Sequence, residues 1–483
     1  MGTVEIIQHD SVYVKLKCSH RVDDEIYDEF SFEIPQAKYH PSVKSGWWDG
    51  VIRLFDIKTG LIYAGLVNRI VEFCETKGHA VTKSLFFDDI NFTEEEAIAF
   101  CDSLNLPHEV RDYQLHSFIQ CVRGGRISTL LPTASGKSLV MYLLARYYDH
   151  KKTLIITTST GLVHQMASDF VDYGCDEDEI YKIIAGESKT SNKRIVISTW
   201  HTIYKMDANF FDEYEVVIGD EIHLFTAKSL VGIMENMKTC EHRFGFTATL
   251  DGSKTSEYVI NGLFGRIVQP TSIAKLIESK HISPLSINAI TLLYSPEERK
   301  KHHDDDWSEE ISFLVDHPIR NKFIVNLAKS LSGNTIVLFR LVGKQGHGLY
   351  KSLCKIIEGR NVYFIHGGVD GVDRDFIRSE MDGENNAIYV ASYGTFSTGV
   401  NTKNIANIIF ASPYKSQVKV LQSIGRGLRL SEGKVQCKLF DISDDLSHNN
   451  KRNHTLKHFI QRISLYNREN LDYKTYNVRL KYE

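Results

Sequence analysis

Cysteine, proline and long apolar runs are all scarce in this sequence of 483 residues. The eight cysteines are scattered and form no CxxC pair, which argues against a zinc site and against a disulfide framework. No run approaches the ~18 consecutive apolar residues that a membrane-spanning helix requires, and the first residues lack the basic and apolar regions of a signal peptide. The sequence therefore predicts a cytoplasmic protein with reduced cysteines and no membrane association.

A large excess of charge of one sign is also missing, since 57 lysines and arginines stand against 61 aspartates and glutamates. The charge is nevertheless unevenly distributed. Residues 1–110 carry 10 basic and 19 acidic groups, whereas residues 446–483 carry eight basic and three acidic groups. The aromatic residues interleaved with this basic end are Phe459, Tyr466, Tyr473, Tyr476 and Tyr482. Such a segment suits a polyanion, and a solvated surface helix explains the pattern equally well.

Short apolar runs recur along most of the chain and indicate its fold class. Runs of four to six apolar or β-branched residues without alternation are typical of strands buried on both faces, as in a parallel sheet covered by helices. Two series of such runs occur, at 127–131, 153–157, 194–198, 215–219 and 243–247, and at 335–339, 362–366, 387–391, 407–411 and 437–442. The sequence therefore predicts two tandem α/β domains with parallel sheets.

The first ~108 residues differ, because alternating stretches there suit antiparallel strands and a small α+β domain. Residues 294–310 are charge-dense without an apolar period and are predicted to form a loop, in which the neighbouring residues 302–306 cannot all face one metal ion. The predicted parts are an N-terminal domain (1–108), a first α/β domain (109–283), a second (284–445) and a basic aromatic tail (446–483).

A phosphate-binding loop is predicted at Leu131-Pro-Thr-Ala-Ser-Gly-Lys-Ser138, between the first buried strand and an amphipathic helix. Backbone N–H groups and the helix N-terminus would surround the phosphates of ATP, Lys137 would add a positive charge, and Ser138 would offer a hydroxyl to Mg²⁺. The common pattern has glycine at the position of Leu131 and often at that of Ala134. The candidate nucleotide-binding residues here are Thr133, Ala134, Ser135, Gly136, Lys137 and Ser138.

Two adjacent carboxylates follow the strand predicted at 215–219, in the order Asp220-Glu221-Ile222-His223. Ligands of open α/β sheets bind at the carboxyl ends of the strands. We expect Asp220 to hold Mg²⁺ and Glu221 to orient and deprotonate the attacking water, because phosphoryl transfer depends on positioning and charge neutralisation.

The ordered set of motifs resembles that of superfamily 2 helicases and translocases. Arg111-Asp-Tyr-Gln114 is similar to the Q motif, in which glutamine reads adenine, and Thr247-Ala-Thr249 is similar to motif III. Ser397-Thr-Gly-Val-Asn401 resembles motif V, and Gln422-Ser-Ile-Gly-Arg-Gly-Leu-Arg429 matches motif VI. The resemblance implies two RecA-like domains that bind ATP. It assigns Arg111, Gln114 and Gly399 to the nucleotide, Gln422 to catalysis, and His223, Thr247 and Thr249 to coupling.

Arg426 and Arg429 are three residues apart and are expected to share one helical face. Guanidinium groups fit phosphate oxygens bidentately and stay charged. Placed on the second domain, they would reach the γ-phosphate only when ATP draws the two domains together, and hydrolysis would release them. Such a cycle would drive movement along a nucleic acid.

The same resemblance implies contacts with a sugar-phosphate backbone. Hydroxyl and backbone donors hold a strand without reading its sequence, and no sequence-reading motif is present. For Trp200, stacking on a base competes with a role in the core. The implied contacts are Thr158, Ser198, Thr199 and Trp200 in the first domain and Arg340, Ser392, Thr395 and Thr398 in the second.

Outside the shared motor motifs, the chain resembles the UvsW family of phage branch-migration and recombination helicases. The likeness is carried by residues 46–56, 145–149, 169–173 and 391–400. It implies an N-terminal domain similar to a double-stranded-RNA-binding fold that engages duplex arms. Trp47 and Trp48 would be a wedge against a base pair, or else one core and one surface residue of a turn.

The expected activity is ATP-dependent unwinding or branch migration of forks, Holliday junctions, R-loops and D-loops in recombination, repair and fork processing. A monomer is expected, acting in the host cytoplasm if the chain is phage-encoded. Single-stranded-DNA-binding or recombination proteins are further candidate partners. Two alternatives stay open: a duplex DNA translocase subunit of a restriction or remodelling complex, and an RNA helicase.

Overall fold

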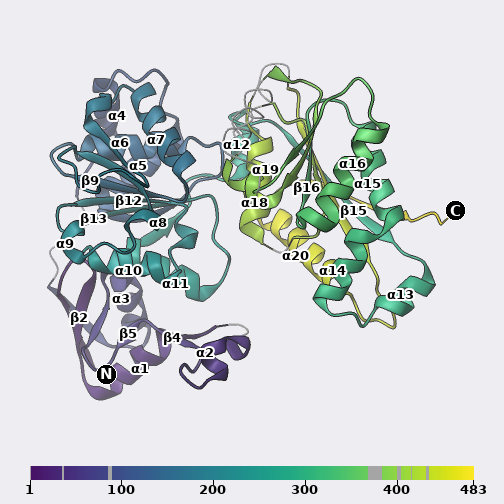
Figure 1. Cartoon of the computed structure of the whole chain (residues 1–483). Coiled ribbons are helices and arrows are strands. Elements are labelled where there is room, and N and C mark those ends of the chain that lie inside the picture. Colours follow the sequence, from purple (N-terminus) through teal and green to yellow (C-terminus); the bar gives the residue numbers. More distant parts are fainter. Residues whose placement is uncertain are drawn as a thin grey trace. The chain divides into compact units, whose positions relative to one another are not determined.

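The structure, a computed structural model, describes residues 2–34, 37–84, 90–367, 383–399, 404–414, 416–430 and 434–482. Its elements are shown in Figure 1. The chain divides into two compact units. The first unit contains Met1–Leu131 and Gly136–Pro270, and the second contains Pro132–Ser135 and Thr271–Glu483.

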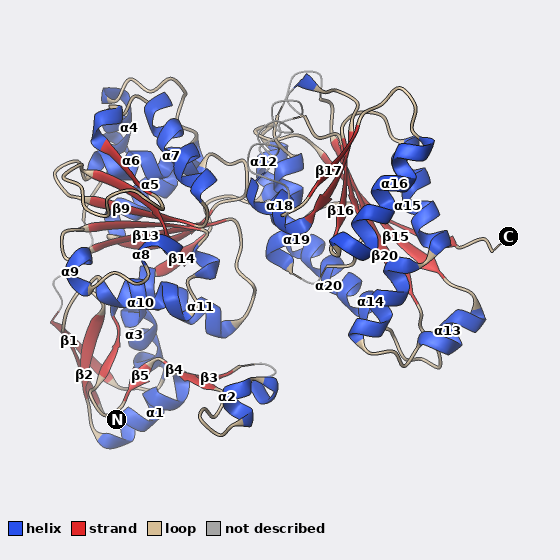
Figure 2. Ribbon diagram, in the orientation of Figure 1, coloured by secondary structure: helices blue, strands red, loops and turns tan. Residues whose placement is uncertain are grey.

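A seven-stranded sheet forms the centre of the first unit, with strand order β10-β11-β9-β12-β13-β8-β14. All its neighbouring strands are parallel. The strands are β8 (Arg126–Leu130), β9 (Thr153–Thr157), β10 (Ile180–Ile183), β11 (Ile195–Thr199), β12 (Val216–Asp220), β13 (His242–Thr247) and β14 (Arg266–Val268). Helices cover both faces of this sheet, as expected for continuous apolar strands (Figure 2).

The first unit also contains eight α-helices between residues 94 and 264, which range from four to 13 residues in length. They are α4 (Glu94–Ser103), α5 (Asp112–Gly124), α6 (Lys137–Tyr147), α7 (Thr160–Asp172), α8 (Trp200–Ile203), α9 (Ala208–Phe211), α10 (Lys228–Asn236) and α11 (Lys254–Phe264).

The N-terminal domain is a five-stranded mixed sheet of order β5-β6-β2-β1-β7, with a separate two-stranded ribbon of β3 and β4. Its strands are β1 (Thr3–Gln8), β2 (Tyr13–Lys17), β3 (Ser31–Glu33), β4 (Val51–Arg53), β5 (Phe55–Asp56), β6 (Leu61–Tyr63) and β7 (Ala80–Ser84). Its helices are α1 (His20–Glu29), α2 (Pro41–Lys44) and α3 (Val67–Thr76).

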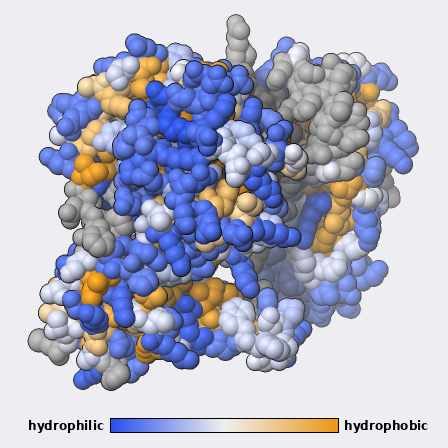
Figure 3. All heavy atoms as spheres, turned by 60° about the vertical axis from the view of Figure 1, so that its left-hand side comes forward, coloured by the Kyte–Doolittle hydropathy of each residue, from blue (hydrophilic) through white to orange (hydrophobic). Residues whose placement is uncertain are grey.

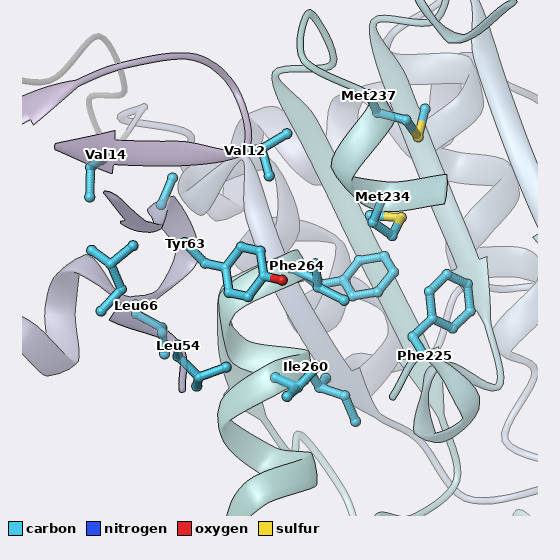
Figure 4. Packing of buried hydrophobic residues seen from close by; sticks show 14 of the residues in the cluster. Val12, Val14, Leu54, Tyr63, Leu66, Phe225, Met234, Met237, Ile260 and Phe264 are labelled. Carbon is cyan, nitrogen blue, oxygen red and sulfur yellow. The ribbon is translucent and has the colours of Figure 1, made fainter. Parts of the chain in front are cut away.

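One hydrophobic core joins the N-terminal domain to the first large sheet. Buried side chains of both parts, among them Tyr63 and Phe264, belong to a single cluster (Figure 4). Tyr13 and Tyr63 stack at 5.3 Å, and their hydroxyls donate to Glu235 Oε1 at 2.9 and 2.7 Å. A Cβ atom at Gly65 would overlap the backbone of α11, so only glycine allows this close approach. The two parts therefore form one packed body.

The second unit is built on another seven-stranded parallel sheet, of order β17-β18-β16-β19-β20-β15-β21. Its strands are β15 (Leu285–Leu293), β16 (Thr335–Phe339), β17 (Val362–Ile365), β18 (Ile388–Ser392), β19 (Asn407–Phe410), β20 (Cys437–Asp445) and β21 (Tyr473–Arg479). Its helices include α12 (Ile273–Glu278), α13 (Pro296–His302), α14 (Trp307–Asp316), α15 (Pro318–Ser330), α16 (His347–Ile356), α18 (Tyr393–Gly399), α19 (Gln417–Gly427) and α20 (His454–Arg468). The predicted fold class, two RecA-like sheets with a small N-terminal α+β domain, is confirmed.

Residues 446–483 are not a tail, and this part of the sequence prediction needs correction. They form α20 and the edge strand β21, which pairs with β15 in parallel register. Arg462 of α20 is buried and makes charge-assisted hydrogen bonds to Asp441 of β20, at 2.7–3.0 Å. At least one arginine of the basic segment is therefore buried inside the second unit, where it pairs with an aspartate.

Residues 294–310 are also more ordered than predicted, since they contain α13 and the start of α14. Two capping boxes explain the difference. Ser295 and Glu298 cap the first helix, and Asp306 and Glu309 cap the second, by reciprocal side-chain to backbone hydrogen bonds. No helix among the described residues is long and apolar enough to cross a membrane.

Candidate functional site

The predicted phosphate loop connects β8 to α6 in the structure. The helix begins at Lys137, directly after Gly136, which has a left-handed φ of +78°. N–H groups at the start of a helix lack the carbonyl acceptors of a preceding turn, and with the helix dipole they favour an anion at this end. Leu131 N donates to Thr247 O at 2.9 Å and so ties the start of the loop to β13.

Ala134 adopts a left-handed conformation, with φ of +69°. Such a conformation costs a non-glycine residue about 1–2 kcal/mol, and a glycine would lose about 0.4–1 kcal/mol more entropy on folding. We therefore expect Ala134→Gly to raise the free energy of unfolding by about 0.5–1 kcal/mol. Denaturant unfolding would measure this, with Ala99→Gly in the exposed interior of α4 as the opposite control, expected to lose about 1 kcal/mol. A loss of stability in Ala134→Gly would contradict the strain.

Gln114, the residue of the Q motif, contacts the phosphate loop. Its side chain is 3% exposed, its Oε1 accepts from Arg111 N at 3.0 Å, and its Nε2 donates to Gly136 O at 3.3 Å. A Cβ atom at Gly136 would collide with this amide. The structure thus brings the Q motif and the phosphate loop together, although they are more than 20 residues apart in sequence.

The two carboxylates lie at the carboxyl end of β12. Asp220 is 7% exposed, and Glu221 has a left-handed backbone with φ of +54°, a strained conformation that is common at active sites. Lys137 Nζ lies 3.7 Å from Glu221 Oε1. Lysine and carboxylate, 84 positions apart in sequence, therefore meet as predicted.

The two carboxylates respond differently to their surroundings. Burial, and then the charge of Glu221, raise the pKa of Asp220. Burial opposes ionisation of Glu221 as well, but Lys137, His223 and Thr247 outweigh it and keep its pKa below the usual range. Glu221 is therefore held as a carboxylate, the form that can accept a hydrogen bond from water.

Glu221 is linked to motif III through hydrogen bonds. Thr247 Oγ1 lies 3.2 Å from Glu221 Oε2 and 3.0 Å from His223 Nδ1. Thr247 Oγ1 is also 3.2 Å from Thr249 O. The three predicted coupling residues thus form one network with the carboxylate. A change in the position of Glu221 would therefore alter its hydrogen bond with Thr247, the last residue of β13.

The two oxygen groups predicted to hold Mg²⁺ are of the kind that this ion prefers, since it binds hard oxygen donors and keeps several waters. They are the Ser138 hydroxyl and the Asp220 carboxylate. Ser138 Oγ is hydrogen-bonded to the hydroxyl of Tyr173 at 2.9 Å, a contact that the sequence did not predict. Among the described residues, no three His, Cys, Asp or Glu side chains gather into a metal-binding cluster.

Motif VI lies on α19 of the second unit, but the predicted common helical face is wrong. The helix ends at Gly427, so that Arg426 is in its last turn and Arg429 lies two residues beyond its end. The Arg426 guanidinium is 5.9 Å from the centre of the Phe396 ring of α18. The glycine at position 427 explains the early end, because glycine is a poor helix former. Gln422 is half-buried on the same helix.

A groove of about 730 Å³ in the first unit has one of the predicted backbone contacts, Thr199, in its lining. Hydroxyl and cationic side chains dominate its lining, and none of its lining residues is acidic. Members of this lining are Ser159, Thr160, Lys189, Thr199, His201, Thr202 and Lys205. Lys189 and Lys205 were missed by the sequence analysis, because isolated surface lysines carry no motif.

Three other residues of the first unit were predicted to contact nucleic acid, and the structure places them in different surroundings. Ser198 is fully buried and its hydroxyl lies 3.1 Å from Ile183 O, so the predicted contact of its side chain with DNA is wrong. Trp200 is half-buried, packs against the core and stacks on His201 at 3.5 Å. Thr158, directly after β9, is half-buried.

The predicted nucleic-acid contacts of the second unit differ in how exposed their side chains are. Arg340 is exposed at the end of β16 and lies over the Trp307 ring at 5.5 Å. Ser392 Oγ is 2.9 Å from Thr395 Oγ1, and Thr395 is 8% exposed. The side chains of Thr398 and Gly399 lie outside the described residues, although both belong to α18.

Comparison with known proteins agrees with this site. Residues 108–252 match the family described as the res subunit of type III restriction enzymes, and residues 3–83 match the family described as the N-terminal domain of the DNA helicase UvsW. The ATP-dependent DNA helicase UvsW of Enterobacteria phage T4 is 33% identical over 99% of this chain and 100% of its own length.

Solved structures give the same result. The crystal structure of T4 UvsW aligns with 31% identity and a TM-score of 0.53, over 99% of this chain and 100% of that one. A second T4 UvsW structure aligns with 32% identity and a TM-score of 0.52, over 56% of this chain and 100% of that one. With its phosphate loop, carboxylate pair and arginine motif, the chain is an ATP-hydrolysing DNA helicase of superfamily 2 that belongs to the UvsW family.

Proposed function

We propose that this helicase acts on branched DNA, unwinding or branch-migrating forks, Holliday junctions, R-loops and D-loops in recombination, repair and fork processing. The observation that supports this most is the similarity to UvsW over the whole length of both chains, including the N-terminal domain that matches its own family. A motor core alone would not distinguish this role from other helicases.

The residues of the first unit suggest how ATP hydrolysis begins. The N-terminal turn of α6 and Lys137 would bind the phosphates, and Glu221 would orient water and accept its proton. Ser138 and Asp220 would hold Mg²⁺, which neutralises phosphate charge when bound. The network of Glu221, His223 and Thr247 would then report the state of the nucleotide to β13.

The second unit would contribute Gln422, Arg426 and Arg429, with Gly399 near the nucleotide, as in related helicases. Arginines that meet the γ-phosphate stabilise charge that develops in the transition state. This assignment rests on motif VI and on the resemblance, and a substitution of Arg426 tests it.

The groove beside α8 is the proposed path of one DNA strand. Hydroxyls and two lysines without an acidic neighbour in the lining suit a phosphate backbone, which is bound by charge and by hydrogen bonds rather than by base reading. Such binding would not depend on DNA sequence.

We expect Lys189→Ala combined with Lys205→Ala to weaken binding of single-stranded DNA. Removing one lysine–phosphate interaction should also reduce the slope of log K against log salt by about 0.7, so the double substitution should reduce it by roughly 1.4. Fluorescence anisotropy over a salt series measures both quantities. The matched control is Lys182→Ala with Lys193→Ala, which line a groove that contains Asp176 and Glu187. Equal effects of the two pairs would contradict a specific strand path.

One alternative has an observation in its favour. The match of residues 108–252 to a restriction-enzyme family suits a duplex translocase that hydrolyses ATP without separating strands. An RNA helicase is the other alternative. The N-terminal match to UvsW favours the helicase on branched DNA over both.

The rate of ATP hydrolysis with a panel of nucleic acids tests the proposed substrate. We expect three-way and four-way DNA junctions to stimulate hydrolysis more than linear duplex or single strands, and RNA to stimulate it least. Equal stimulation by linear duplex would favour the translocase, and greater stimulation by RNA would favour the RNA helicase. Monomeric state, partner proteins and location in the host cytoplasm stay predictions.

A further inference from the structure

A small arm projects from the N-terminal domain. It consists of the ribbon β3–β4 and of the segment 37–50 between these strands, which contains α2 (Figure 1). In Figure 2 the arm extends away from the five-stranded sheet. Its described residues are 31–34 and 37–53.

The base of this arm is fixed to the body of the first unit. Phe32 of β3 is buried and its ring lies 4.7 Å from that of Tyr258 on α11. Leu54 and Phe55, which follow β4, belong to the core shared with the large sheet. The arm therefore belongs to the same compact unit as Lys137, the first residue of α6.

The tip of the arm presents an aromatic ring to solvent. Trp47 is 89% exposed, and Tyr39 on the same arm is 62% exposed. The neighbouring Trp48 is held instead, because its indole N–H donates to Val51 O at 3.0 Å and its ring contacts that of His40 at 5.5 Å. Of the two tryptophans, Trp48 is half-buried and held by these contacts, and Trp47 is the surface residue.

The charge of the arm differs from that of its domain. Asp49 is paired with Arg53, whose guanidinium hydrogen bonds hold the pKa of Asp49 at about 2, and so Asp49 is ionised but balanced. Lys38 and Lys44 are exposed and add two positive charges. With the exposed Glu33 of β3 included, the arm carries one more basic than acidic side chain, whereas residues 1–110 as a whole carry nine more acidic than basic groups.

An exposed aromatic residue can also be a contact for a protein partner. Large apolar patches are typical of protein interfaces. The face of the first unit shown in Figure 3 is mainly hydrophilic, with apolar side chains in small separate groups. Two exposed rings, Trp47 and Tyr39, on an arm that also carries two exposed lysines match the way in which proteins hold unpaired bases, by stacking and by charge on the backbone.

We propose that Trp47 stacks on an unpaired base at a DNA branch point while Lys38 and Lys44 contact the flanking phosphates. The inference rests on the proposed function and adds to it the residue that recognises the branch. Because the arm and Lys137 belong to one body, a base held by Trp47 would move together with the first unit during each ATP cycle.

The test uses the full chain and a synthetic three-way DNA fork with 2-aminopurine at the branch point, with linear duplex as reference. Stacking is worth about 1–3 kcal/mol per base, which corresponds to a loss of about 5- to 150-fold. We expect Trp47→Ala to weaken fork binding by at least about 5-fold and to abolish the change in 2-aminopurine fluorescence. Trp47→Phe should retain much of both, because a smaller ring still stacks.

Controls separate this inference from the proposed function. Ile98→Ala removes another exposed apolar side chain, on α4, and should leave fork binding unchanged. ATP hydrolysis without DNA should be the same in all variants, which also shows that they are folded. Unchanged fork binding by Trp47→Ala, with wild-type protein that binds forks, would overturn the role of Trp47 alone and favour a protein partner. Failure of the wild type to prefer forks would overturn both.

Discussion

Replacing Glu221 by glutamine is expected to lower kcat for ATP hydrolysis by about 10²–10⁴-fold, the usual contribution of a general base. Glutamine keeps the size of the side chain and can still accept a hydrogen bond from Thr247, but it cannot take a proton from water. ATP binding should be retained or tightened, since removal of the carboxylate removes a negative charge near the phosphates. Single-turnover hydrolysis and the fluorescence of a labelled ATP analogue measure the two effects.

Glu187→Gln is the matched control for this substitution, because Glu187 is an exposed glutamate of the same unit. It should leave kcat unchanged. If Glu221→Gln kept more than a tenth of wild-type kcat, the carboxylate near Lys137 would be structural and the assigned base would be wrong. A parallel loss of ATP binding would instead point to misfolding of the phosphate loop.

Replacing Arg426 by alanine is expected to reduce kcat by about 10³–10⁵-fold, the range found for arginines that stabilise transferring phosphoryl groups. The Kd for ATP should change little, because Lys137 and the first turn of α6 belong to the first unit. Arg426→Lys should recover only part of the rate, since an ammonium cannot make two parallel hydrogen bonds to phosphate oxygens.

Arg429→Ala provides a comparison within motif VI. Arg429 lies beyond the end of α19, so its position is less firmly set by the helix than that of Arg426. We expect Arg429→Ala to lower kcat for ATP hydrolysis less than Arg426→Ala does. Turnover by Arg426→Ala within 10-fold of wild type, at unchanged ATP binding, would contradict the proposed contact with the γ-phosphate.

Much of the fold could be predicted because both sheets consist of short buried runs. The ten expected strands are all present, although several differ by one residue at an end and the strand predicted at 437–442 continues to Asp445. The edge strands β10, β14 and β21 were missed, because exposure on one side weakens the apolar signal, and the inner strand β15 was missed as well. β21 has mostly exposed side chains, and β14 is only three residues long.

The candidate site of the first unit was also predictable, since Lys137, Glu221 and Thr247 belong to motifs that lie at the carboxyl ends of parallel strands. What motifs do not encode was missed. Tyr173 reaches Ser138 from the end of α7, and the lysines of the groove come from separate loops. Residues 446–483 were predicted to form a basic tail, yet Arg462 in this segment is buried against Asp441 because α20 packs on the second sheet.

The measurement that tests the account most directly is the separation of strands of a synthetic four-way DNA junction by the full chain, followed by gel electrophoresis. With ATP, the junction should be converted into duplex arms, and neither omission of ATP nor Glu221→Gln protein should give product. Hydrolysis of ATP on the junction without any change in its strands would contradict the account.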